Sequence, residues 1–213
     1  MSHIYIESHD FTDGLVDDLA GAKRIALDCE AAGFHRYSDR LCLIQLTVAD
    51  RTYILDPLGF DPREILRAPL EDPSVEVLMH GADFDLRLLS RDLGIKLRGL
   101  SDTQIYAALI GEEGLGLQSL LESRLGVRLS KKYQRADWAQ RPLSESMLEY
   151  AAEDTRHLER LTGLLLEDLD GLGRRAWAEE ECRALEAVAD DVQSEDELDP
   201  VTRVKGARDL SPR

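Results

Sequence analysis

Two acidic residues interrupt an apolar segment near the start of the chain. Within RIALDCE, residues 24–30, Asp28 and Glu30 stand where a buried strand would carry hydrophobic side chains. Side chains two positions apart leave a strand on the same face, so these carboxylates would lie next to each other. Neighbouring carboxylates raise each other's pKa unless a cation lies between them, and Mg²⁺ or Mn²⁺ prefers such oxygen ligands. Taken alone, however, the pair fits a solvated edge strand with both acids facing water better than it fits a metal site.

Two further segments place acids where ligand sites are common. In HGADFDL, residues 80–86, Asp85 falls in the first turn of an expected helix that follows a strand, and Asp83 is the expected cap. Ligand sites gather at such strand ends in α/β sheets, although an acid there also stabilises the helix dipole. Later in the chain, Tyr150 and Asp154 are four residues apart and share one face of an expected helix. A core tyrosine and a surface acid would also explain that pair.

The order of apolar patterns predicts an α/β fold. Alternating apolar residues indicate strands, and apolar residues three and four apart indicate helices. The expected strands are residues 4–8, 24–30, 42–48, 52–57 and 75–80, of which the third and fourth form a hairpin. The expected helices are residues 11–22, 61–70, 82–94, 102–111, 117–126, 144–169 and 176–192. The chain should therefore form a mixed sheet with helices, followed by a helical second half.

The charge of the chain is large, negative and unevenly spread. A net charge of −16 argues by itself against a nucleic-acid partner, because proteins that bind polyanions are usually basic. Residues 179–199 hold ten acids against one arginine, whereas residues 122–141 hold six basic and two acidic side chains. The local distribution is therefore a better guide to partners than the total.

The cysteines and the apolar segments bear on the compartment. Three scattered cysteines without a CxxC spacing fit reduced thiols in a cytosol better than a disulfide framework. No apolar run is long enough to span a membrane, and the first residues lack the pattern of a signal peptide. We therefore expect a cytoplasmic protein without a membrane partner.

The ordered set of motifs resembles the DEDD superfamily of 3′→5′ exonucleases and, within it, ribonuclease D. The match covers roughly residues 3–170 and consists of DCE with the following CLIQL, HGADFDL, and YAAED, joined by SDTQIYAALIG and LGVRLSKKYQRADWAQRPLSESMLEYAAED. A sibling subfamily has histidine five residues before the last acid, where this chain has Glu149, so the tyrosine type fits better. The resemblance implies a ribonuclease H-like fold, in which an antiparallel three-strand start is followed by parallel strands.

The resemblance also implies a reaction and a role for each motif residue. Two divalent ions, Mg²⁺ or Mn²⁺, would assist hydrolysis of the terminal phosphodiester. Asp28, Glu30 and Asp154 would hold one ion, Asp28 and Asp85 the other, and Tyr150 would orient the attacking water. The substrate would be the 3′ end of single-stranded RNA, including tRNA precursors, and the products nucleoside 5′-monophosphates. A DNA exonuclease and a non-catalytic nucleic-acid-binding module on the same fold remain as alternatives.

The basic segment LSKKYQRADWAQR is the expected substrate contact. Basic side chains would meet phosphates and aromatic rings would stack on bases, although a core tryptophan and solvated lysines would explain the same residues. The candidates, with two further residues expected to line the cleft, are Lys131, Lys132, Arg135, Tyr133, Trp138, Gln45 and His80.

The sequence predicts three parts along the chain. Residues 1–170 form the expected exonuclease domain and residues 171–193 a C-terminal helix. Residues 194–213 form a polar tail that resembles the segment leading to a helical HRDC domain in ribonuclease D.

Overall fold

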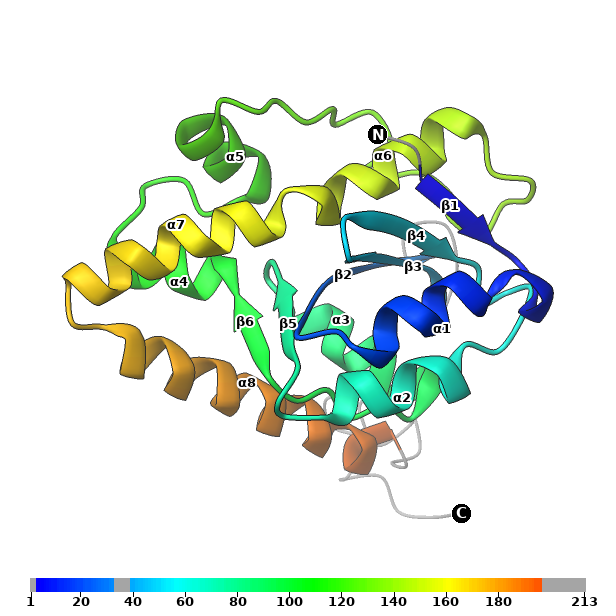
Figure 1. Cartoon of the computed structure of the whole chain (residues 1–213), viewed down its shortest axis with the longest axis horizontal. Coiled ribbons are helices and arrows are strands. Elements are labelled where there is room, and N and C mark those ends of the chain that lie inside the picture. The colour runs from blue at the N-terminus through cyan, green and yellow to red at the C-terminus, as the bar shows by residue number, and fades with distance from the viewer. Residues whose placement is uncertain (1–2, 33–38, 197–213) are drawn as a thin grey trace, which may run out of the picture.

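A six-stranded sheet forms the centre of the molecule (Figure 1). The computed structural model describes residues 3–32 and 39–196, with 191–196 as backbone only. The strand order across the sheet is β1-β4-β3-β2-β5-β6. The strands are β1 (His3–Ile6), β2 (Arg24–Ala31), β3 (Leu41–Val48), β4 (Arg51–Leu55), β5 (Glu76–Met79) and β6 (Leu100–Asp102).

The sheet is antiparallel in its first part and parallel in its second. β2, β3 and β4 pair antiparallel, and the two-residue turn between β3 and β4 uses Ala49 and Asp50, both with positive φ. β5 runs parallel to β2, and β6 runs parallel to β5. β1 pairs parallel with β4 at the other edge. The predicted α/β class, with an antiparallel three-strand start followed by parallel strands, is therefore confirmed.

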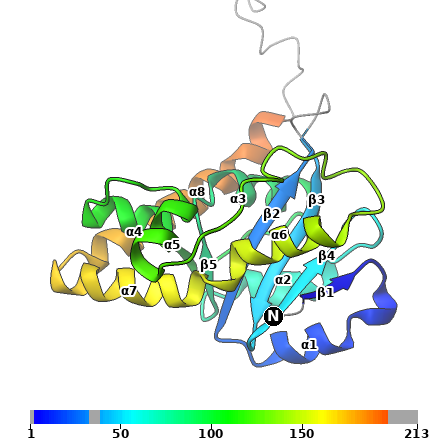
Figure 2. The same ribbon diagram turned by 90° about the horizontal axis from the view of Figure 1, so that it is seen from above.

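Helices cover both faces of the sheet and one of its edges. Among the described residues they are η1 (His9–Phe11), α1 (Asp13–Ala20), α2 (Arg63–Glu71), α3 (Asp83–Leu88), the π-helical η2 (Leu89–Leu93), α4 (Thr103–Ile110), α5 (Leu117–Leu125), α6 (Glu145–Arg156), α7 (Leu158–Gly171) and α8 (Arg175–Asp196). α6 crosses one face of the sheet, and α1 and α2 lie on the other (Figures 1 and 2).

Among the described residues the core has a large part, a small part and a third part of three buried residues, Ala26, Leu78 and Leu158. The large part joins leucines of α1, α2 and α3 to alternate residues of the central strands, such as Leu27 and Ile44. The small part lies under α6, where Leu148 and Ala151 pack against Leu43. The alternation of strand side chains between the two faces means that Asp28 and Glu30 belong to the α6 side while Cys29 packs in the large core.

The prediction of one helix over residues 144–169 is wrong in one respect, because the structure has two helices there. α6 begins after Ser144, whose hydroxyl accepts the Met147 N–H at 3.3 Å, and it ends at His157, where φ is −109° and ψ is −2°. The break lets α6 lie on the antiparallel strands while α7 packs over β5. The apolar spacing over residues 144–169 is continuous, so the sequence did not reveal this break.

Two smaller expectations also differ from the structure. Ala82, not Asp83, precedes the first residue of α3, and Asp83 pairs with Arg87 one turn later. β6 was not expected at all, because three residues are too few to show a strand pattern.

The C-terminal helix α8 packs into the same core as the sheet. Ala178, Cys182 and Ala189 are buried there, and the Glu186 side chain accepts the backbone N–H of Leu100 at 2.8 Å on the edge strand β6. The helix continues to Asp196, three residues beyond the expected end, and the expected tail lies mostly outside the described residues. Over the part of the chain that the structure describes, every helix is too short or too polar to cross a membrane.

Candidate active site

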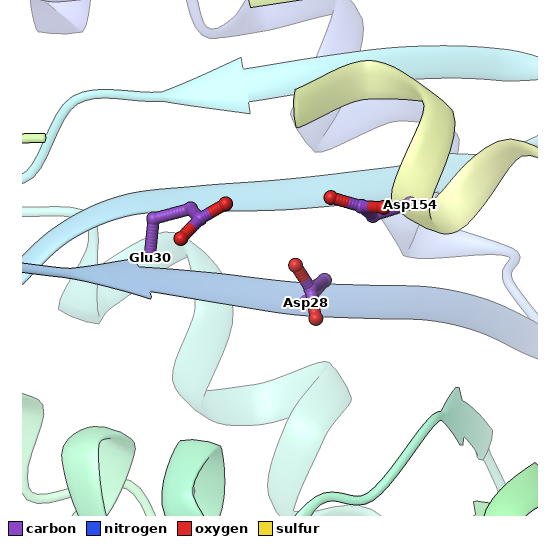
Figure 3. Close-up of side chains that lie close together, drawn as sticks. All are labelled: Asp28, Glu30 and Asp154. Atoms are coloured by element: carbon purple, nitrogen blue, oxygen red, sulfur yellow. The ribbon is translucent and has the colours of Figure 1, made fainter. Parts of the chain in front are cut away.

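Three carboxylates from two elements converge on the α6 side of the sheet (Figure 3). Asp28 and Glu30 leave the same face of β2, and Asp154 reaches them from α6. One oxygen of each lies within 4.8 Å of the others, and all three side chains are half-buried. Asp154 thus joins two acids that are more than 120 positions earlier in the chain, and the three form one acidic cluster.

Asp85 also lies near Asp28, outside this group of three. β5 pairs with β2 only from Arg24 to Ala26, so the rest of β2 extends past β5 and the start of α3 comes near Asp28. A turn at Gly81, with φ +68°, leads into α3. Asp85 is 7% exposed and faces the negative charge of Asp28.

Asp102 holds that turn in place. Its carboxylate accepts the N–H of Gly81 at 3.0 Å and that of Ala82 at 2.8 Å, and it also caps α4 by accepting the N–H of Gln104 at 2.7 Å. A single buried acid therefore ties the start of α3 to the start of α4. These hydrogen bonds fix the position of Asp85, in the first turn of α3, relative to the sheet.

Burial raises the pKa of every acid in the cluster, and repulsion by neighbouring acids adds to the effect for Glu30, Asp85 and Asp154. Burial raises the pKa of Asp28 to about 7. Burial, with the charge of Asp28 next, raises the pKa of Asp154 to about 8. The pKa values of Glu30 and Asp85 are also well above their usual range, first through burial and then through the charge of Asp28. Acids so placed favour a bound cation, because a cation restores their ionised form.

The donor set fits a hard divalent metal. Its members are carboxylate oxygens, which Mg²⁺ and Mn²⁺ prefer, and Asp28 neighbours both Asp85 and the Glu30–Asp154 pair. No arginine, lysine or histidine of the described residues forms an ion pair with these four acids. The cluster thus lacks compensating charge from the side chains that the structure describes.

Tyr150 lies one helical turn before Asp154, against two aromatic rings. The Trp138 ring centroid is 6.1 Å from that of Tyr150, and the Tyr133 centroid is 5.9 Å away in an edge-on arrangement. Burial, followed by the charge of Asp154, raises the pKa of the Tyr150 hydroxyl above its usual value. The hydroxyl therefore stays protonated near neutral pH and can donate a hydrogen bond.

Two cavities flank the carboxylates. The polar one, of about 570 Å³, is lined by residues that include His80, Lys131 and Tyr150. The other, of about 380 Å³, has mainly apolar walls that include Phe84 and Trp138. Asp154 borders the polar cavity and Glu30 the apolar one, while Gln134 borders both.

The residues expected to touch the substrate have different surroundings. Lys131 and His80 line the polar cavity, and the Nδ1 of His80 lies 2.9 Å from the hydroxyl of Thr103. The ammonium of Lys132 lies 4.9 Å from the centre of its neighbour's ring, Tyr133.

Of the other four candidates, Tyr133 is half-buried against the Tyr150 ring, one is exposed and two are buried. Arg135 is exposed. Trp138 is 1% exposed and packs in the small core, as the alternative interpretation held. Gln45 is 0% exposed, so in this structure it offers no surface to a substrate.

Phe84 and Gln134 are site residues that sequence reasoning missed. Phe84 is 45% exposed although it is a large apolar residue, and it stands beside Asp85 at the apolar cavity. An aromatic residue between two acids in a first helical turn is a signal that the sequence does contain. Gln134 lies inside the basic segment LSKKYQRADWAQR, but nothing in the sequence distinguishes it from its neighbours there.

Comparison with known proteins agrees with this geometry. A family model described as 3′-5′ exonuclease matches residues 4–170. The Saccharomyces cerevisiae exosome complex exonuclease RRP6 is 36% identical over 73% of this chain and 21% of its own length. The crystal structure of Escherichia coli RNase D superposes with a TM-score of 0.83 and 30% identity, covering 98% of this chain and 61% of that one.

A further solved structure that resembles this chain contains a metal. Brucella melitensis NrnC with bound Mg²⁺ superposes with a TM-score of 0.76 and 26% identity, covering 93% of this chain and 96% of that one. The chain thus spans about a fifth of the yeast protein and most of the NrnC chain. The matched residues contain the three acidic motifs and the whole sheet. The chain therefore belongs to the 3′-5′ exonuclease family, and within it resembles ribonuclease D.

Proposed function

We propose that this chain is a divalent-metal-dependent exoribonuclease that removes nucleotides one at a time from the 3′ end of single-stranded RNA. The observation that carries the proposal is the convergence of Asp28, Glu30 and Asp154 within 4.8 Å, with Asp85 facing Asp28 from α3. Two divalent ions at these acids would stabilise the charge on the attacking and leaving oxygens of an in-line displacement.

The position of each acid suggests which of the two metal ions it would hold. Asp28 neighbours both Asp85 and the Glu30–Asp154 pair, so it would contact both ions. Glu30 and Asp154 would complete the position on the side of α6, and Asp85 the position on the side of α3. The attacking water belongs on the α6 side, because Tyr150 is there.

Tyr150 would orient the water rather than take its proton. Its raised pKa keeps the hydroxyl protonated, so it can donate a hydrogen bond but is a poor general base near neutral pH. The rings of Trp138 and Tyr133 restrict its side chain, which keeps the hydroxyl aimed at one place. Such positioning contributes to rate because reacting groups then need no reorientation.

The two cavities suit the two parts of an RNA end. A base can pack against Phe84 in the apolar cavity beside Glu30, and the preceding phosphates can lie in the polar cavity near Lys131. Stacking on an aromatic ring tolerates any base, which fits an enzyme that degrades successive nucleotides.

Two acids on one helix provide the sharpest test. Asp85 and Asp83 are two residues apart on α3, but only Asp85 faces the cluster, whereas Asp83 pairs with Arg87 at the surface. On a 5′-labelled RNA with Mg²⁺ or Mn²⁺, we expect a ladder that shortens from the 3′ end. Asp85→Asn should lower the rate by about 10³-fold or more, because a charge held for the transition state is lost. Asp83→Asn should cleave like the parent.

The controls separate the alternatives. EDTA should stop the reaction, and Asp28→Asn should behave like Asp85→Asn. A DNA strand of the same sequence that shortens faster than the RNA would favour a DNA exonuclease. Intact RNA and DNA with either metal, together with binding of RNA, would show a non-catalytic module and end the proposal.

A further inference from the structure

Gln45, in the middle of β3, has a property that the proposed function does not explain. Its side chain is 0% exposed, and neither its amide nitrogen nor its amide oxygen has a hydrogen-bond partner among the described residues. A primary amide carries two donors and an acceptor, and burying them unpaired costs the fold free energy. A leucine would fill similar space without that cost. An amide at this position therefore needs a reason beyond the stability of the fold.

The register of the sheet places Gln45 beside the acidic cluster. Gln45 and Asp28 are partners across the antiparallel pair of β3 and β2, so their side chains point to the same face. Two residues along β3, the Thr47 hydroxyl lies 2.8 Å from that of Thr155 on α6, which identifies the face as the one that α6 covers. Asp154 immediately precedes Thr155. The Gln45 amide thus lies beneath α6 and next to Asp28.

Apart from Thr47, the other neighbours of Gln45 in the sheet are apolar. Ile54 is its partner on β4, and Leu43 is the next residue on the same face of β3. Both belong to the small core together with Ala151, one helical turn before Thr155. Within these surroundings, the carboxylate of Asp28 is the neighbouring group best able to accept a hydrogen bond from the amide.

We propose that Gln45 is a positioning residue for Asp28. Its amide N–H donates a hydrogen bond to the Asp28 carboxylate when a divalent cation binds, and this bond fixes the plane of the carboxylate that both metal positions share. Metal-binding carboxylates are held in this way by neighbouring donors, and loss of the donor weakens metal binding about 10- to 100-fold. The inference rests on the proposed function, since it requires Asp28 to bind a metal.

Gln45→Leu tests this role because stability and metal affinity should change in opposite directions. In EDTA, the melting temperature should rise by roughly 2–4 °C, because an unpaired amide is removed. Mn²⁺ binding, measured by calorimetry without RNA, should weaken about ten-fold. The cleavage rate should fall at low Mn²⁺ and return toward that of the parent at saturating Mn²⁺.

Thr47→Val is the matched control on the same strand. The Thr47 hydroxyl has two partners, Thr52 at 3.0 Å and Thr155 at 2.8 Å, and Thr47 lies two register pairs further from Glu30 than Gln45 does. This variant should melt at a lower temperature than the parent and bind Mn²⁺ with unchanged affinity. A purely structural role for Gln45 would make Gln45→Leu behave in the same way.

The outcomes are distinct. Parent-like Mn²⁺ affinity in Gln45→Leu overturns the inference, whatever its melting temperature. If that variant does not fold, Gln45→Met removes the same donor with an unbranched side chain, and parent-like affinity there overturns the inference equally. If the parent protein itself binds no Mn²⁺, the proposed function fails and the role of Gln45 fails with it.

Discussion

At the scale of single residues, the site combines acids that repel one another with a tyrosine that aromatic rings hold still. The Tyr150 hydroxyl is one helical turn from Asp154, and the rings of Trp138 and Tyr133 lie against its own. Removing the hydroxyl leaves this packing intact, since phenylalanine has the same ring. The contribution of the hydroxyl can therefore be separated from that of the fold.

Tyr150→Phe should lower kcat by about 10²-fold with little change in KM. Loss of orientation of one reacting group costs a factor of this size, whereas the substrate contacts remain. Steady-state cleavage of labelled RNA measures both constants. Unchanged kcat would remove Tyr150 from the reaction, and a large rise in KM alone would make it a substrate contact.

The raised pKa values of Asp28 and Asp154 predict how the metal-free protein responds to pH. In the folded state these carboxyls lose their protons at about 7 and about 8, but in the unfolded chain near the ordinary value of roughly 4. The folded state binds more protons between those values, so the free energy of unfolding falls as pH rises through that window.

In EDTA, the melting temperature should accordingly be higher at pH 5 than at pH 8. Saturating Mn²⁺ should reduce or reverse the difference, because the cation stabilises the ionised acids. Asp28→Asn should flatten the dependence in EDTA. A melting temperature that rises with pH in EDTA would contradict the raised pKa values.

At the scale of elements, an ion pair fastens the segment between α5 and α6 to the sheet. The Arg141 guanidinium donates to both oxygens of Asp56, at 2.5 and 2.7 Å, and to the carbonyls of Cys42 and Trp138. Tyr5 donates to the same carboxylate at 2.6 Å. The bond to the Trp138 carbonyl holds Trp138 in place, and the ring of Trp138 packs against Tyr150.

Arg141→Ala should destabilise the protein by about 3 kcal/mol, because it leaves the buried Asp56 carboxylate without its cation. Arg63→Ala is the control, since Arg63 and Asp61 form a pair that is about half exposed. That variant should change the free energy of unfolding by less than about 1 kcal/mol. Urea unfolding curves measure both. Equal effects would show that the Arg141 contact does not secure the segment.

The elements that sequence reasoning predicted are those with a local pattern. The hairpin of β3 and β4 and the helices carry alternating or helical apolar spacing, and the motif acids follow from the strand and helix on which they lie. The break at His157 and the strand β6 follow from tertiary packing, so the local sequence does not reveal them. The burial of Gln45 could not be predicted for the same reason, because it depends on α6 lying over that face.

At the scale of the whole molecule, charge is separated between two sides. The acidic part of α8 covers the edge of the sheet at β6, and α5 and α6, with the basic segment between them, lie on the opposite side (Figure 1). The proposed RNA substrate would therefore approach the basic side, although the net charge of the chain is −16.

Lys131→Ala should make RNA binding less sensitive to salt, because Lys131 lines the polar cavity. Loss of one phosphate contact with a single strand lowers the slope of log affinity against log salt by about 0.7. Lys132→Ala should have a smaller effect, since that ammonium lies over the Tyr133 ring. Titrations at several salt concentrations, with metal withheld, give the slopes. Equal slopes for both variants and the parent would exclude the contact.

The way in which α8 covers the edge of the sheet at β6 has a consequence for self-association. An unprotected edge strand offers a row of backbone groups to which another chain can add a strand. Here a glutamate of α8 takes the N–H of Leu100 on β6, and Arg98 beside that strand pairs with Asp190 of the helix. A helix cannot serve as a template for a further strand. Crowded molecules of this protein can therefore meet at this edge without joining their sheets.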